Sequence, residues 1–149
     1  MKTKKINVLS SQFLLNALII LSMLVVLVML FHDIGRMVGS YIFIPWILFF
    51  FAGVGLIIAT CKEKISGKLK FFMLSSGFSS AGFLLCVVLH NLFYALSTIT
   101  DKLVVLDKIV DLFGAAFFFA AIIICPVGFI VGMVGTFIIL KKSQSEKNY

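Results

Sequence analysis

One uninterrupted apolar stretch decides the fold: residues 112–140 read LFGAAFFFAAIIICPVGFIVGMVGTFIIL and contain no Asp, Glu, Lys or Arg. A helix needs ~20 residues to cross a hydrocarbon core of ~30 Å, so this stretch is long enough to span a membrane. Strands of membrane barrels have only ~10 residues and alternate apolar with polar side chains. The stretch is apolar on every side and therefore predicts a transmembrane helix.

Three more apolar stretches share these properties, at about residues 13–31, 41–60 and 71–96. The chain of 149 residues is 62% hydrophobic and only 13% charged. Soluble domains are nearer half apolar and a quarter charged, so this composition excludes a soluble globular enzyme and a disordered chain. We expect one transmembrane domain over residues 1–149: an all-α integral membrane four-helix bundle with antiparallel up-down topology and a polar tail at 141–149.

The distribution of basic residues predicts the orientation. Ten of the 13 Lys and Arg residues fall in the N-terminal tail, in the loop after the second span and in the C-terminal tail. Basic residues in short loops stay cytoplasmic, so both termini of this multi-pass protein should face the cytoplasm of a cell membrane. This asymmetry accounts for the formal net charge of +7 without nucleic-acid binding. The expected partner is the lipid bilayer, whose anionic headgroups attract cytoplasmic lysines.

Small residues mark the predicted helix contacts, because helices in lipid associate by close approach of their backbones. At 100° per residue, small residues form one stripe on the fourth span, two opposite faces on the third, and a shorter stripe of Ala52, Gly55 and Ala59 on the second. The third span should therefore be the centre of the bundle. The expected helix-packing residues are Gly77, Ala81, Gly82, Gly128, Gly132 and Gly135.

Two local irregularities are expected around the fourth span. Pro126 should kink this helix, because it removes a backbone hydrogen bond in mid-membrane. Residues 101–111 place apolar side chains on one face and charged ones on the other. They predict either a short amphipathic helix at the outer interface or an extension of the fourth span with a hinge at Gly114.

The candidate site residues are two histidines and their neighbours. Cys86 and His90 share one face of the third span, and His32 and Asp33 close the first span at the same outer level. These four residues are candidates for metal binding, and the two histidines for haem ligation, although their spacing matches no recognised metal motif. In the alternative interpretation His90 is structural, neutral and bonded to Asn91 or to a carbonyl of a neighbouring helix. We expect no bound cofactor.

No catalytic residues are expected, and the chain is not predicted to be an enzyme. Ser79 and His90 share a helix face but lie ~16 Å apart along the axis, too far for a nucleophile and its base. The three cysteines form no C-x-x-C motif, which argues against thiol oxidoreductases. Cys86 and Cys125 lie at similar depth and could meet. No span contains the carboxylate that a proton-coupled exporter needs.

Three segments in the C-terminal half carry a resemblance: SSGFSSAGF at 75–83, VLHNLFYAL at 88–96 and IIICPVGFIVG at 122–132. They resemble a group of small uncharacterised multi-pass membrane proteins of bacteria and archaea. The resemblance implies that residues 89–91 and 125–128 are signature positions. It implies no activity.

These features favour a non-enzymatic accessory or interaction protein that packs into a homo-oligomer or a larger membrane complex. The support for this function is the number of small-residue faces, which exceeds what a minimal bundle uses. The alternative is a metal- or haem-binding or small-solute-handling membrane protein that uses the outer His and Cys residues.

Overall fold

The computed structural model describes residues 9–30, 43–100 and 104–145, which contain helices and no strand. The helices are α1 (Leu9–Leu30), α3 (Phe43–Lys62), α4 (Gly67–Thr100) and a last continuous run of α5 (Val104–Phe119), the π-helix η2 (Ala120–Ile124) and α6 (Cys125–Ser145). Four helical stretches are long and apolar enough to cross a membrane. This confirms the predicted all-α class and the number of candidate membrane spans.

The third and fourth spans are much longer than the first two. They contain 33 and 39 residues, against 18 and 20 for the first and second. The fourth apolar helical stretch begins at Val105 rather than near Leu112, because α5 runs directly into η2 and α6 instead of forming a separate helix. The predicted polar tail also starts later, since α6 remains helical to Ser145.

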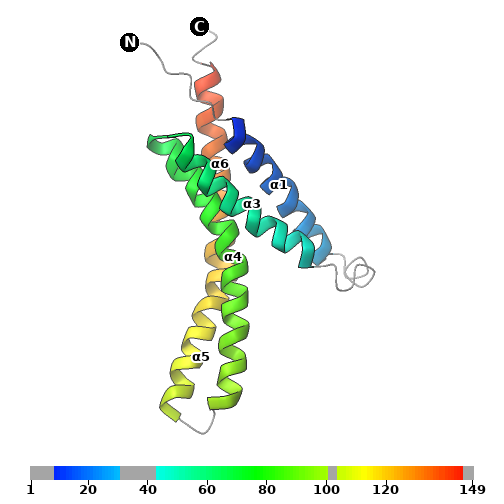
Figure 1. Cartoon of the computed structure of the whole chain (residues 1–149), viewed down its shortest axis with the longest axis vertical. Coiled ribbons are helices and arrows are strands. Elements are labelled where there is room, and N and C mark those ends of the chain that lie inside the picture. The colour runs from blue at the N-terminus through cyan, green and yellow to red at the C-terminus, as the bar shows by residue number, and fades with distance from the viewer. Residues whose placement is uncertain (1–8, 31–42, 101–103, 146–149) are drawn as a thin grey trace.

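α4 is the central helix, as the small residues on two of its faces predict. It contacts α3 on one side and α5, η2 and α6 on the other, whereas α1 packs mainly on α3. Figure 1 shows α4 and the α5–α6 run as one long hairpin, with α1 and α3 crossing obliquely over the half of it that contains α6. The other half of the hairpin extends past α1 and α3.

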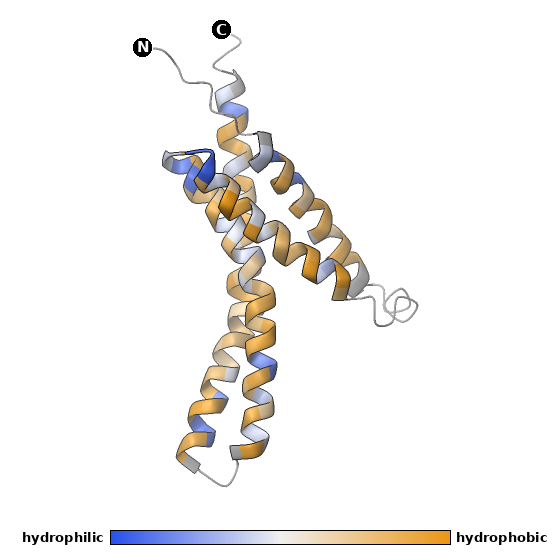
Figure 2. Cartoon of the chain, in the orientation of Figure 1, coloured by the Kyte–Doolittle hydropathy of each residue, from blue (hydrophilic) through white to orange (hydrophobic). Residues whose placement is uncertain are grey.

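Apolar side chains cover the outside of the bundle as well as its interior. The buried core is small and lies where α1, α3 and α6 converge, at Leu15, Leu18, Leu56 and Phe129. Figure 2 shows hydrophobic residues around each helix, with hydrophilic positions concentrated towards the helix ends. This distribution suits helices whose solvent is lipid, because apolar side chains are stable wherever the protein surface contacts hydrocarbon.

α3 and α4 pack with their backbones in contact. A Cβ atom on Gly53 would lie 2.9 Å from the carbonyl oxygen of Gly77 and 2.9 Å from the backbone nitrogen of Ala81. Gly53 is outside the stripe predicted for the second span. Gly55, which is in that stripe, faces Leu14 of α1, with 3.5 Å between the position of its missing Cβ and the leucine methyl carbon. The two faces of α3 therefore serve different neighbours.

α4 and α6 pack through the predicted glycine stripe of the fourth span. Gly128 lies against Ser79, Gly132 against Ser76 and Phe72, and Gly135 against the Phe72 ring. On the α4 side, Gly82 faces the Cys125 sulfur. The six predicted packing residues thus all lie at contacts between helices of a single chain.

The helix before Pro126 departs from α-helical geometry through a widened turn, the π-helix η2. The backbone N–H of Cys125 donates to the carbonyl of Ala120, five residues earlier. The proline ring would clash with the carbonyl four residues before it, and a π-turn moves that carbonyl away. No hinge occurs at Gly114, which is buried inside the continuous helix α5.

The turn between α3 and α4 holds the start of α1. Glu63 in this turn accepts hydrogen bonds from the backbone N–H groups of Ser10 (3.1 Å) and Ser11 (3.3 Å), and from the Ser11 hydroxyl (2.6 Å). The first N–H groups of a helix lack partners within the helix, and a carboxylate there complements the helix dipole. Glu63 therefore caps α1 from the α3–α4 turn and joins this turn to the start of α1. We name this end of the bundle the lysine-rich end, after Lys62, Lys64, Lys68, Lys70, Lys141 and Lys142.

Candidate functional site

His90 is held by the neighbouring helix. Its Nδ1 lies 2.9 Å from the carbonyl oxygen of Gly114, and its ring packs on Phe118 with 5.1 Å between centroids. A carbonyl oxygen only accepts, so Nδ1 carries the hydrogen and donates. Asn91 bonds instead to Val87 of its own helix. Of the two interpretations of His90, this contact favours the structural one, with a carbonyl of a neighbouring helix as partner.

The predicted metal ligands do not gather in the part of the chain that the structure describes. His32 and Asp33 lie outside the described residues. Among residues 9–30, 43–100 and 104–145, no group of three or more His, Cys, Asp or Glu side chains is placed to hold a metal ion. Cys86 and His90 are one turn apart on α4, but each contacts a different part of the fourth span.

The thiols of Cys86 and Cys125 lie within interaction distance of each other across the α4–α6 contact. Cys125 is buried, Cys86 is half-buried, and neither is in a disulfide. Gly82 borders this pair, and a Cβ there would lie at ordinary contact distance, 3.5 Å, from the Cys125 sulfur. The structure thus brings together the two cysteines whose equal depth was apparent from the sequence.

A cavity of about 300 Å³ opens beside Cys125. All four spans contribute to its walls, which are largely aromatic and aliphatic. Trp46 packs edge-on against Phe83, and Phe49 against Phe129, each with 5.4 Å between ring centroids. Its few polar side chains are serines and Cys125. Such a lining suits hydrocarbon better than an ion or a polar solute.

A second cavity, of about 450 Å³, lies between α1 and α6 towards the lysine-rich end. Most of its lining side chains are apolar, and one of them, Met133, also lines the first cavity. Its polar side chains are Gln12, Asn16 and Lys141. The two cavities adjoin at Met133 along α6, and we name them together the α1–α6 crevice. At 1.5 Å per residue, the part of α6 from Lys141 to Cys125 gives the crevice a length of ~24 Å.

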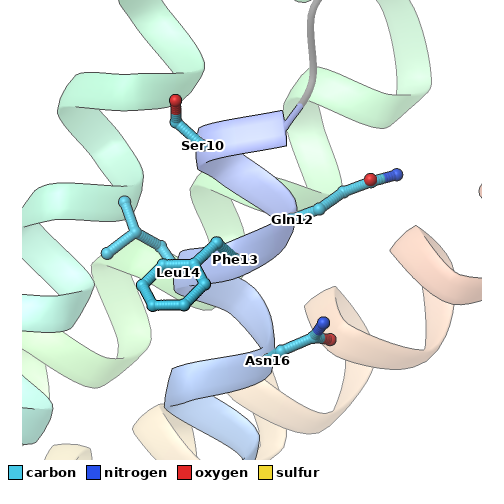
Figure 3. A pocket seen from close by; sticks show the side chains of 5 residues that line it. All are labelled: Ser10, Gln12, Phe13, Leu14 and Asn16. Carbon is cyan, nitrogen blue, oxygen red and sulfur yellow. The ribbon is translucent and has the colours of Figure 1, made fainter.

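A third hollow, of about 780 Å³, lies on α1 alone. Figure 3 shows its five lining side chains, with Ser10 and Leu14 on one side of the helix and Gln12 and Asn16 on the other, towards α6. One helix cannot enclose a ligand, so this hollow is a surface groove. It shares Gln12 and Asn16 with the crevice.

The far half of the hairpin is covered by nothing except its own two helices in the described structure. Phe93 stacks on Phe113 and Phe117, with 5.5 and 5.6 Å between ring centroids. We name residues 92–100 and 104–112 the α4–α5 tip. Its charged residues are Asp107, Lys108 and Asp111, while Ile99, Val105 and Leu112 are 75%, 74% and 69% exposed.

Comparison with protein families, characterised proteins and solved structures finds no match.

The crevice residues were missed by the sequence analysis, although part of a signal was present. Gln12 and Asn16 are four residues apart and so share a face of α1 at its start. Nothing local predicts that Lys141, from the other end of the chain, lies opposite them. That proximity depends on how α1 and α6 are placed on α3 and α4.

Proposed function

We propose that this chain is a non-enzymatic accessory protein of the cell membrane, oriented with both termini in the cytoplasm, which binds a second integral membrane protein through the α4–α5 tip. The small-residue faces no longer supply the support, because α3, α4 and α6 use them within one chain. The supporting observation is the exposed apolar surface of the tip.

The length of α4 supports a tip outside the hydrocarbon. Lys70 is the last charged residue before the apolar part of α4. From there ~20 residues, or slightly more in a tilted helix, cross the ~30 Å core and reach the level of His90 to Phe93. The tip lies beyond this level. Asp107, Lys108 and Asp111 on α5 agree with this placement, since a charged side chain in hydrocarbon is costly.

The apolar surface of the tip then requires a cover other than acyl chains. Ile99, Val105 and Leu112 are largely exposed. Contiguous apolar surface rimmed by charged residues marks protein interaction sites. A protein in the same membrane can present its outer segments at this height, and we infer that it contacts the tip. From the segments 75–83, 88–96 and 122–132 we also propose kinship with small multi-pass membrane proteins of bacteria and archaea.

The test is photo-cross-linking in native membranes with benzoylphenylalanine in place of Ile99. The matched control places it at Phe78, which is also exposed but lies between Lys70 and His90, in the part of α4 that we place in the hydrocarbon core. We expect one discrete heteromeric product from position 99 and none from position 78. Val105→Asp should abolish the product from position 99. This variant should keep the fold, because a charged side chain at the tip would lie in water. No protein product, or one at twice the mass of the chain, would overturn the proposal.

A further inference from the structure

We propose that the α1–α6 crevice binds one anionic phospholipid from the leaflet at the lysine-rich end, with its headgroup at Lys141 and one acyl chain reaching the cavity beside Cys125. The inference rests on the membrane-spanning fold and is independent of the tip. It concerns a ligand held between helices of one chain.

The polar end of the crevice supplies donors at two depths. Lys141 lies at its mouth, and Gln12 and Asn16 project towards α6 (Figure 3). Among the described residues, neither amide makes a side-chain hydrogen bond. An amide without a partner in hydrocarbon is costly. A phosphate at Lys141 and Gln12, with ester carbonyls near Asn16, would satisfy these donors together.

The apolar part of the crevice matches a lipid tail in length and chemistry. Ile19 and Phe137 line its first part, and Met133 lines both this part and the aromatic cavity that contains Trp46. Its ~24 Å length from Lys141 to Cys125 is close to the ~20–22 Å occupied by one leaflet with its headgroups. A lipid there would replace contacts that α1 and α6 do not make with each other.

Charge selects an anionic headgroup. The described residues at this end include Lys62, Lys64, Lys68, Lys70, Lys141 and Lys142. The acidic side chain Glu63 is already occupied by Ser10 and Ser11 of α1. A basic pocket between transmembrane helices favours anionic lipid over zwitterionic lipid.

Trp46 reports occupancy directly, because it is the single tryptophan of the chain and lines the inner cavity. The protein is reconstituted in phosphatidylcholine vesicles containing small, increasing fractions of phosphatidylglycerol brominated near the chain ends. The same titration with brominated phosphatidylcholine gives the unspecific baseline. We expect the anionic lipid to quench Trp46 fluorescence at lower mole fraction, and to saturate.

Two matched pairs of variants locate the site. Lys141→Gln should weaken the preference for the anionic lipid about fivefold, whereas Lys142→Gln, next to it but outside the crevice, should change it little. Ile19→Phe fills the crevice and should abolish the preference, whereas Ile20→Phe, on the exposed side of α1, should not. Helix content by circular dichroism verifies the fold of each variant. Equal quenching by both lipids, or equal effects within either pair, would overturn the proposal.

Discussion

Gly132 of α6 lies directly against the backbone of Ser76 of α4: a Cβ on the glycine would come within 2.6 Å of the Ser76 backbone nitrogen. This contact joins the two long helices of the hairpin where α3 also packs on α4. The membrane offers little hydrophobic drive for helix association, so close backbone packing and hydrogen bonds hold the bundle. The Ser75 hydroxyl, for example, donates to the Gly128 carbonyl at 3.1 Å.

Gly132→Ala should destabilise the hairpin by about 1–3 kcal/mol, because the added methyl group meets backbone atoms that cannot move aside. Gly82→Ala is the matched control, since its Cβ would sit 3.5 Å from the Cys125 sulfur, an ordinary contact. Unfolding of the detergent-solubilised protein with increasing SDS measures both. Equal stability of the two variants would contradict the α4–α6 packing.

Glu63→Gln should free the start of α1. The neutral side chain keeps its shape but interacts less with the helix dipole and with the donors of Ser10 and Ser11, at a cost of about 1 kcal/mol. Hydrogen exchange followed by mass spectrometry should show faster exchange in the first turns of α1 and little change in α6. Lys64→Gln, in the same turn, serves as the control for the loss of a charge. Unchanged exchange in α1 would show that Glu63 does not cap it.

His90→Leu separates the structural interpretation of this histidine from the ligand interpretation. Loss of the hydrogen bond to the Gly114 carbonyl should cost about 1 kcal/mol in SDS unfolding. Asn91→Leu should cost less, because Asn91 is exposed and bonds only to its own helix. Metal and haem contents of purified wild type and variant should be the same. A metal or haem present in the wild type and lost in His90→Leu would restore the cofactor function.

Cys86 and Cys125 should form an intramolecular disulfide when membranes are treated with iodine, because the Cys125 sulfur lies against α4 at Gly82 and within interaction distance of the Cys86 thiol. After denaturation, maleimide should then label only Cys61, which is exposed at the end of α3. In Cys86→Ser, Cys125 should become available to maleimide again. Full labelling of all three thiols in the oxidised wild type would contradict the register of the two helices.

The sequence predicts those parts of the fold that depend on one helix at a time. Four apolar stretches give the four spans, and small residues on two faces of the third span predict its central position. The sequence does not predict which faces of two helices pack against each other. Gly53 was missed because Ala52, Gly55 and Ala59 offer another stripe, and the crossing of α3 over α4 decides which face is used.

The candidate sites show the same division. The single predicted residue set of His32, Asp33, Cys86 and His90 relied on equal depth, and depth does not say which helix faces carry the side chains. His90 and Cys86 meet Gly114 and Cys125 of the fourth span, while His32 and Asp33 lie outside the described residues, so the four-residue set stays a prediction. The crevice joins Gln12 to Lys141, which are at opposite ends of the sequence, so no local pattern could predict it.

If the α4–α5 tip projects from the outer face of the membrane, reagents outside intact cells should reach it. Lys108→Cys, at the exposed charged rim of the tip, is treated with a membrane-impermeant maleimide in a chain whose native cysteines are replaced by serine. A parallel protein retains only Cys61, at the lysine-rich end. We expect position 108 to be labelled in intact cells, and Cys61 to be labelled only after permeabilisation. Labelling of Cys61 in intact cells, with position 108 protected, would contradict it.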